Sequence, residues 1–262
     1  MNSPLRPQPF VVVSTNHGTM IANRNDYHQL PNGGAYGVGH QLFSSGAFDP
    51  GEVDMVKKLL LLQRQHFGDG VVALDCGANI GVHSIEWGKL MYGWGSVIAF
   101  EAQERLYYAL AGNIAINNCF NVSARNVALA SESGVIQIPA PDYTKPASYG
   151  SLELRKRERT ENIGQSIDYS KLIDVHSLAL DSLSLSRCDL IKLDVEGMEL
   201  DVLAGSRDLM EKLHPTMLVE VIKTDQNSLR KIMKESGYLV FEAGINWVCV
   251  HEASPVLASI RR

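Results

Sequence analysis

Hydrophobic and polar positions fall into two alternating kinds of block from residue 51 onward. Short apolar runs rich in Val, Ile and Leu are typical of buried strands, and longer blocks with apolar residues three or four positions apart are typical of helices. The runs predict strands at 71–75, 96–101, 121–130, 134–139, 189–194, 216–221, 238–242 and 246–250. The longer blocks predict helices at 51–67, 79–92, 104–118, 195–213 and 225–237.

This regular exchange of strands and helices predicts an α/β fold with a mostly parallel sheet that has helices on both faces. The last two strands are joined only by "AGI" (243–245), so they predict an antiparallel hairpin at one edge. The strand at 134–139 is predicted to pair with the strand at 121–130 as another hairpin. Because ligands of such sheets bind beyond the carboxyl ends of the strands, the residues that end the strands are the candidate site residues.

Two segments interrupt this pattern. Residues 1–50 are rich in Gly, Pro, Asn and Ser and predict an irregular N-terminal segment before a single domain at 51–262. Residues 140–173 form a polar insertion with the basic cluster "RKRER" (155–159), which is either a solvated face or a clamp for an anionic acceptor. The insertion also has tyrosines suited to stacking on a sugar ring, and these make a lid plausible: Tyr143, Tyr149 and Tyr169.

Composition narrows the class of protein. The net charge of -5 over 262 residues argues against a nucleic-acid binder that relies on bulk positive charge. The four cysteines are dispersed without a C-x-x-C pair, so we interpret them as reduced thiols in a cytoplasmic protein. No apolar run reaches the length of a membrane span, and the first residues lack the pattern of a secretory signal. The oligomeric state stays open.

The strand at 71–75 ends in an acid and leads into a glycine-spaced turn, "LDCGANIGVHS" (74–84). A dinucleotide would favour G-x-G-x-x-G, with its pyrophosphate at the helix N-terminus. Here Gly77 and Gly81 enclose Asn79 instead, and Asp75 would lie close to a phosphate of the same charge. S-adenosylmethionine has an ammonium, a sulfonium and no phosphate, so it suits this turn better. Glu101, at the end of the next strand, can accept hydrogen bonds from ribose hydroxyls.

Three stretches carry a resemblance to a known family: "LDCGANIGVHS", "VIAFEAQERLYYALAGNIAINN" and "DLIKLDVEGMELDVLAGS". Over about residues 40 to 240 the chain resembles the FkbM family of S-adenosylmethionine-dependent methyltransferases, and the third stretch is the most specific. The resemblance implies a Rossmann-like class I methyltransferase fold with a seven-stranded sheet. One departure from the family is "FEA" with Ala102, where many members have Pro; we expect it to change the stiffness of the loop and not ribose binding.

The resemblance also implies roles for individual residues. Asp75, Gly77, Asn79 and Gly81 would line the methionine end of the cofactor, and Glu101 would bind the ribose. Ala128 would lie beside the adenine and contact it through its backbone.

Methyl transfer to a hydroxyl benefits from a general base that removes the proton as attack proceeds. Asp194, at the end of the strand at 189–194, is our first candidate, with Glu196 and Glu220 on the same rim. Together these carboxylates could instead bind magnesium, but the sequence favours a site without metal. Two structural alternatives stay open. Asp194 and Glu196 could cap the helix that follows, and Glu220 could form an ion pair with Lys192 or Lys223.

Two residues close to the motifs in sequence are interpreted as structural. His83 is predicted to be a packing residue, and Glu199 to be a solvated or salt-bridged helix residue. The function most consistent with the sequence is therefore O-methylation of a hydroxyl on a sugar, glycan or natural-product precursor. The acceptor would be a small molecule or glycan and not a nucleic acid. The alternatives are a methyltransferase acting on nitrogen, protein or nucleic acid, a cofactor-binding module without chemistry, and a dinucleotide dehydrogenase, which the turn spacing disfavours.

Overall fold

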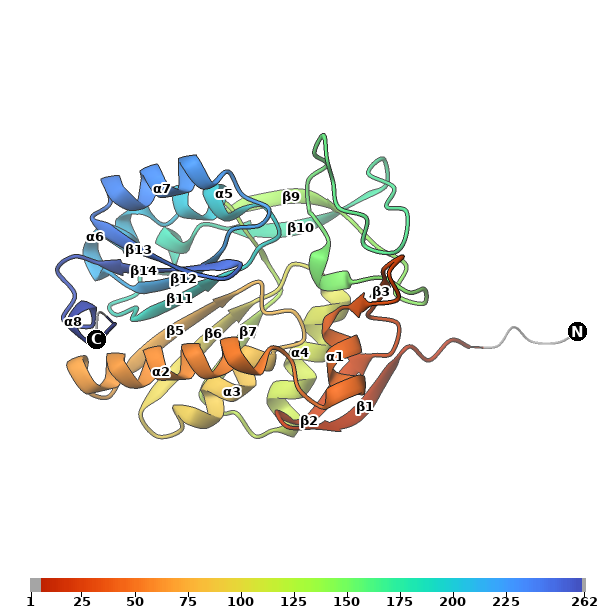
Figure 1. Ribbon diagram of the computed structural model, residues 1–262, viewed down its shortest axis with the longest axis horizontal. Helices are drawn as coiled ribbons and strands as arrows, with labels where there is room; N and C mark the ends of the chain where they lie inside the picture. The colour runs from red at the N-terminus through yellow and green to blue at the C-terminus, as the bar shows by residue number, and fades with distance from the viewer. Residues whose placement is uncertain (1–5, 261–262) are drawn as a thin grey trace, which may run out of the picture.

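A seven-stranded sheet forms the centre of the computed structural model, which describes residues 6–260 (Figure 1). Its strand order is β13-β14-β12-β11-β5-β6-β7. The strands are β5 (Val71–Cys76), β6 (Gly95–Phe100), β7 (Val122–Arg125), β11 (Leu190–Leu193), β12 (Thr216–Glu220), β13 (Tyr238–Ala243) and β14 (Asn246–His251). Only β14 runs antiparallel to its neighbours, so the mostly parallel sheet and the hairpin at its edge are confirmed.

Helices cover both faces of this sheet, as predicted (Figure 1). One face packs on α2 (Pro50–Phe67), α3 (Val82–Leu90) and α4 (Glu104–Ile116), and the other on α5 (Glu199–Ala204), α6 (Arg207–Leu213) and α7 (Gln226–Glu235). Neighbouring residues of one strand therefore enter different cores: Ala73 belongs to the first and Leu74 to the second. Burial on both faces explains why the central strands are continuous apolar runs rather than alternating ones.

The predicted helix at 195–213 is wrong in its extent, because two helices, α5 and α6, occupy this stretch. The chain before α5 forms a loop in which Glu196 and Gly197 have φ angles of 54° and 91°. The break between the helices lies at Gly205, where a Cβ atom would come within 2.4 Å of the carbonyl oxygen of Ala130. The loop that contains Ala130 and Ser131 therefore packs so closely here that only glycine fits, and the helix is interrupted at this residue.

The strand predicted at 121–130 is also divided. Its first part is β7, whereas β8 (Ala128–Leu129) belongs to a second sheet with the order β8-β10-β9. The predicted hairpin with 134–139 is wrong: β9 (Gly134–Pro139) pairs antiparallel with β10 (Leu172–Leu178), a strand that the sequence pattern did not reveal. The polar insertion is thus the connection between β9 and β10, and it contains a short 3-10 turn, η1 (Tyr149–Ser151).

The N-terminal segment is more regular than predicted. It forms a hairpin of β1 (Phe10–Thr15) and β2 (Gly18–Asn23), a small pair of β3 (His28–Gln29) and β4 (Ala35–Tyr36), and helix α1 (Val38–Ser45). The β-branched residues of "FVVVST" favour this hairpin, and Ile21 donates its backbone N–H to Asn113 Oδ1 of α4 at 2.6 Å. Residues 1–5 of the predicted segment lie outside the described residues.

A buried aspartate ties the N-terminal segment to the insertion. The Asp26 carboxylate accepts hydrogen bonds from the backbone N–H groups of Gly39 (2.9 Å) and Tyr149 (3.1 Å). Burial raises the pKa of Asp26 to about 6 despite these two hydrogen bonds.

Two short elements complete the described chain, η2 (Leu180–Leu183) and α8 (Leu257–Ile260).

Between residues 6 and 260, none of the helices has both the length and the apolar character required to traverse a bilayer.

Candidate active site

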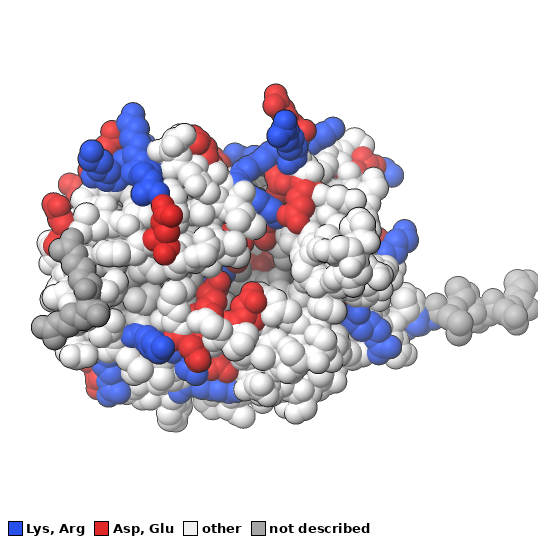
Figure 2. All heavy atoms as spheres, viewed as in Figure 1, with Lys and Arg blue, Asp and Glu red and all other residues white. Residues whose placement is uncertain are grey.

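A cavity of about 340 Å³ lies at the carboxyl ends of the central strands, where the strand order reverses between β5 and β11. This is the position where open α/β sheets bind their ligands. Figure 2 shows Asp and Glu side chains gathered in a hollow on this face. Eight of the nine residues predicted for the site line the cavity: Asp75, Gly77, Asn79, Glu101, Ala128, Asp194, Glu196 and Glu220. Gly81 is not among the lining residues.

The turn after β5 passes very close to the end of β11. Gly77 has a φ of 86°, and a Cβ atom there would lie 1.8 Å from the carbonyl oxygen of Asp194. Any side chain at this position would therefore displace the backbone that carries Asp194. Gly81 has a different place: it precedes α3, and its Cβ atom would meet Leu110 of α4 at 2.5 Å. In the structure Gly81 contributes helix packing next to the cavity.

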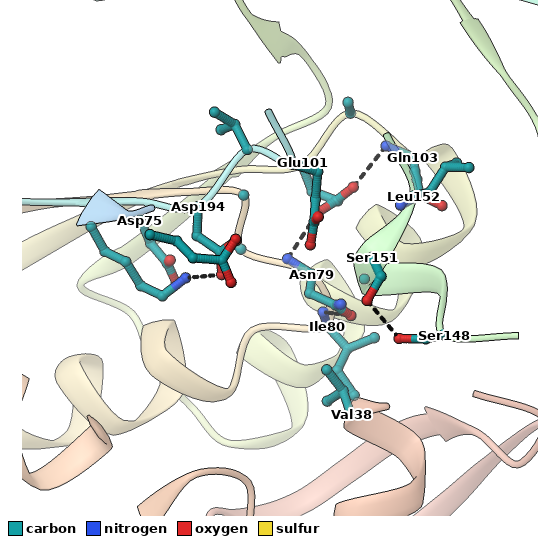
Figure 3. A pocket seen from close by; sticks show the side chains of 18 of the residues that line it. Val38, Asp75, Asn79, Ile80, Glu101, Gln103, Ser148, Ser151, Leu152 and Asp194 are labelled. Carbon is teal, nitrogen blue, oxygen red and sulfur yellow. Dashed lines mark hydrogen bonds and ion pairs between the residues drawn. The ribbon is translucent and has the colours of Figure 1, made fainter. Parts of the chain in front are cut away.

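Asp75 fits the cationic methionine end of S-adenosylmethionine. Its side chain is only 1% exposed, and Oδ2 accepts a hydrogen bond from Ser84 Oγ at 2.5 Å. The second oxygen, Oδ1, is buried and has no hydrogen-bond partner among the described residues. A buried carboxylate oxygen without a partner is costly, so a bound ammonium group would satisfy it. Figure 3 shows Asp75 next to Asp194, and Asn79 close to Glu101.

Glu101 directly follows β6, and two backbone N–H groups hold its carboxylate. Its Oε2 accepts from Asn79 N–H and its Oε1 from Gln103 N–H, both at 2.8 Å (Figure 3). Burial raises the pKa of Glu101 to about 7, although these hydrogen bonds act in the opposite direction. Each carboxylate oxygen keeps a lone pair for a further donor, which suits the two hydroxyls of a ribose.

This pKa predicts a pH-dependent affinity for the cofactor product, S-adenosylhomocysteine. The ionised carboxylate accepts ribose hydroxyls better than the neutral acid, so we expect the dissociation constant to rise as the pH falls from 8 to 6. Calorimetric titration at several pH values measures this change. In Glu101→Gln, which cannot ionise, binding should be weaker by roughly ten- to a hundred-fold and should lose this pH dependence. The same pH dependence in Glu101→Gln would contradict the role of Glu101.

Ala128 lies where an adenine could pack. It is buried in β8 and lines the cavity together with Val127 and Leu129. Asn126 fixes the approach to this strand, because its side-chain amide donates to the carbonyl oxygens of Glu101 and Ala102 at 2.8 and 3.2 Å. The small side chain of Ala128 leaves room in the cavity next to Ala102, the residue after Glu101.

Three carboxylates converge at the ends of β11 and β12, next to the turn after β5. One oxygen each from Asp194, Glu196 and Glu220 lies within 4.8 Å of the others. Asp194 directly follows β11, Glu220 ends β12, and Glu196 lies in the loop before α5. Burial, followed by the charge of Asp194, raises the pKa of Glu196 to about 8 and that of Glu220 to about 9. The mutual repulsion of these acids therefore favours a proton shared within the cluster, which can then both donate and accept hydrogen bonds.

The two structural alternatives for these acids are wrong. The helix after the motif begins with Met198 as its N-cap residue and has no side-chain cap, so neither Asp194 nor Glu196 caps it. Glu220 forms no ion pair among residues 6–260, and its buried Oε2 has no hydrogen-bond partner there. The two lysines bind other acids: Lys192 Nζ lies 2.7 Å from Asp194 Oδ2, and Lys223 contacts Glu196.

Lys192 is a site residue that the sequence analysis considered only as a partner of Glu220. Its side chain is buried, and its ammonium lies among the carboxylates of Asp194, Asp75 and Glu52. Burial alone would lower the pKa of Lys192, but these carboxylates raise it above its ordinary value. A lysine in the middle of the apolar run "DLIKLD" was the sequence signal for this role, because buried lysines need charged partners.

Glu199 organises the loop that carries Glu196, which corrects its prediction as a solvated or salt-bridged helix residue. Its side chain is buried, and Oε1 accepts from the N–H groups of Gly197 (3.0 Å) and Val195 (3.3 Å). His83 is confirmed as a buried packing residue, with its ring next to Phe48 and Trp87. It also lines the cavity, and its Nε2 lies 3.0 Å from Glu52 Oε1.

The insertion borders the cavity in a way that differs from the prediction. None of its three tyrosines is among the lining residues, and Tyr149 is fully buried against Tyr143, so stacking on a sugar ring is wrong for it. The basic cluster makes contacts within the protein: Arg155 pairs with Asp201 at 3.0 Å, and Arg157 donates to the carbonyl oxygens of Gly197 and Lys223. These contacts hold the insertion against the acid cluster.

The fold and the site together define a class. A mostly parallel seven-stranded sheet with a reversed edge hairpin, a glycine turn after β5 and an acid at the end of β6 is the arrangement of a Rossmann-like class I methyltransferase. The family model described as the methyltransferase FkbM domain matches residues 75–240. The chain belongs to the FkbM methyltransferase family. Membership makes it a methyltransferase and implies S-adenosylmethionine as its cofactor.

Several known proteins are similar to this chain. "Methyltransferase 1" of Beauveria bassiana is 24% identical over 216 residues, which cover 75% of this chain and 85% of the relative. "Methyltransferase sdnD" of Sordaria araneosa is 26% identical over 198 residues, covering 66% and 76%. The crystal structure of methyltransferase FkbM from Methylobacillus flagellatus KT has a TM-score of 0.49 at 14% identity. That match covers 72% of this chain but only 48% of the crystallised protein.

Proposed function

We propose that the protein transfers a methyl group from S-adenosylmethionine to a hydroxyl of a sugar, glycan or natural-product precursor. One observation carries this proposal: the residues suited to the cofactor and the converging carboxylates line the same cavity. An acceptor bound at the carboxylates would therefore lie directly next to the cofactor. In-line displacement at a methyl group requires mainly this juxtaposition and the exclusion of water.

The proposed cofactor residues act by binding and orientation. Asp75 receives the ammonium at its free Oδ1. Gly77 lets the backbone after β5 pass close to the end of β11. Asn79 donates its backbone N–H to Glu101, which holds the ribose. When bound, S-adenosylmethionine supplies an electrophilic methyl group on its sulfonium. Gly81 supports the turn from behind through its contact with Leu110.

Asp194 is the proposed general base. It lies at the end of β11, beside the glycine turn, and the Lys192 ammonium compensates its charge. A hydroxyl acceptor would donate its hydrogen bond to the Asp194 carboxylate and lose that proton as the new C–O bond forms. Glu220, with a pKa of about 9 caused by burial and by Asp194, is protonated at neutral pH. Its carboxylic acid can donate a hydrogen bond that orients the acceptor.

The same carboxylates are close enough to hold a divalent cation. Two ammonium groups, those of Lys192 and Lys223, already balance the negative charge from both sides. We therefore propose that the reaction proceeds without magnesium.

The test is transfer of a labelled methyl group from S-adenosylmethionine to a panel of sugars, glycosides and natural-product alcohols in the presence of EDTA. We expect an O-methylated product whose rate is unchanged by EDTA, and loss of the reaction in Asp75→Ala because the cofactor no longer binds. Activity only after magnesium is added would contradict the metal-free mechanism. Cofactor binding without transfer to any hydroxyl, amine, protein or nucleic-acid acceptor would favour a non-catalytic binding module.

A further inference from the structure

The segment after β12 places one lysine among three partners. The Lys223 ammonium contacts Glu196 Oε2, lies 2.6 Å from Glu161 Oε2 and donates to the carbonyl oxygen of Ser151 at 2.9 Å. An ammonium has three N–H donors, so all of them are used. The side chain is only 9% exposed and lines the cavity. Such a fully bonded, buried ammonium has a fixed position.

Two of these three partners come from the insertion, and the insertion is itself anchored. Tyr36 of the N-terminal segment donates its hydroxyl to Glu161 Oε1 at 2.5 Å, and the backbone N–H of Glu161 donates to the buried Glu153 at 2.8 Å. Arg157, also in the insertion, donates to the carbonyl oxygens of Lys223 itself and of Gly197, the residue after Glu196. Two cations, Lys223 and Arg157, therefore link the insertion to the loop that carries Glu196.

Glu196 needs this support, because its backbone has an uncommon conformation. Its φ of 54° is in the left-handed region, which non-glycine residues seldom adopt. Strained residues of this kind persist when the surroundings fix them, and they are concentrated at functional sites. Lys223 is the group that bonds the Glu196 side chain in the structure, whereas Glu199 holds the loop backbone.

We propose that Lys223 is a positioning residue of the active site: fastened by Glu161 and Ser151 of the insertion, it fixes the Glu196 carboxylate beside Asp194 and Glu220 and balances part of their charge. This inference rests on the proposed function, since it assigns the insertion a share in the same site. The insertion then completes the acid cluster in addition to covering the cavity.

The charges around Glu196 give this proposal a measurable consequence. The groups that face Glu196 are Asp194, Glu220, Glu161, Tyr36, Lys223 and, behind Asp194, Lys192. Without Lys223, three close carboxylates would have only the Lys192 ammonium to compensate them. A missing opposite charge at this distance raises the pKa of a carboxyl by about 1–3 units. Glu196 would then stay protonated to higher pH.

The experiment is a ¹³C NMR titration of glutamate side-chain carboxyls with S-adenosylhomocysteine bound, in which Glu196→Gln identifies the Glu196 signal. In Lys223→Met we expect the Glu196 midpoint to move up by about 1–3 pH units, and in Lys223→Arg we expect it to stay near the wild-type value. Lys57→Met is the matched control, because Lys57 pairs with Glu86 between α2 and α3 and is not among the cavity-lining residues. An unchanged midpoint in Lys223→Met would overturn the proposal.

Kinetics distinguish positioning from a general structural effect. In Lys223→Met kcat should fall while KM for S-adenosylmethionine stays within about two-fold of the wild type, and Lys223→Arg should restore most of the wild-type kcat. A rise in KM as large as the fall in kcat, or no rescue by Lys223→Arg, would show a merely structural role and overturn the proposal. If the NMR midpoint moves but the wild type methylates no acceptor, the proposed function fails while the assigned contact between Lys223 and Glu196 stands.

Discussion

Asp194→Asn is expected to lower kcat by about 10²–10⁴, the usual contribution of a general base. Asparagine has nearly the same shape and can still accept a hydrogen bond from Lys192, so the cavity wall should keep its form. The amide, however, cannot take the proton of the acceptor hydroxyl. Cofactor affinity should change much less than turnover, because Asp194 lies at the acceptor side of the cavity. Steady-state kinetics and calorimetric titration with S-adenosylhomocysteine measure the two effects separately.

A suitable control for this substitution is Asp208→Asn. Asp208 is exposed on α6 and pairs with Lys212 at 2.9 Å, and it is not among the residues that line the cavity. Its substitution should leave kcat unchanged and should affect stability by less than about 1 kcal/mol. Undiminished turnover in Asp194→Asn would show that a different group accepts the proton, and Glu196 would then be the next candidate.

Gly77→Ala is expected to abolish cofactor binding. The added Cβ atom would lie 1.8 Å from the carbonyl oxygen of Asp194, so the turn after β5 and the end of β11 must move apart. The positive φ of Gly77 adds about 1–3 kcal/mol of backbone strain. Because the turn and Asp194 form two walls of one cavity, the displacement changes both. Denaturant unfolding and titration with S-adenosylhomocysteine would record the loss of stability and of affinity.

The chain offers a control with the same backbone requirement and open space. Gly93 has a φ of 81°, and no atom lies within 4 Å of the position of its Cβ. Gly93→Ala should therefore show the strain alone and retain cofactor binding. The additional loss in Gly77→Ala measures the steric contact with Asp194. Equal behaviour of the two variants would contradict the assignment of Gly77 to the cavity wall.

Much of the central fold is local information that the sequence carries. The buried strands are continuous apolar runs, and a helix such as α2 has a regular apolar face, so both could be predicted from spacing alone. Strand β10 escaped prediction because it is mostly exposed at its start and is stabilised by pairing with β8 and β9. The division of 195–213 into α5 and α6 depends on the contact between Gly205 and Ala130, which no local pattern reveals.

In the candidate site, too, the sequence predicted some residues and not their partners. Asp75, Glu101 and Asp194 could be predicted because an acid at the end of a parallel strand must lie at one edge of the sheet. The partners of these acids could not, since they depend on how loops fold back. Lys223 was considered as a partner of Glu220 and instead binds Glu196 and Glu161, so that the three residues join three separate segments of the chain.

The residues that line the cavity are distributed unevenly along the sequence. Most residues suited to the cofactor lie in one short stretch, from Asp75 to Gln103, with Ala128 of β8 outside it, whereas the N-terminal segment, the insertion and the loop after β12 supply other lining residues. Mutations, insertions or deletions in those outer segments can reshape this part of the cavity and leave the stretch from Asp75 to Gln103 untouched. We therefore expect differences in acceptor between related proteins to map to the N-terminal segment and the insertion, which are the places to compare when related sequences are sorted by substrate.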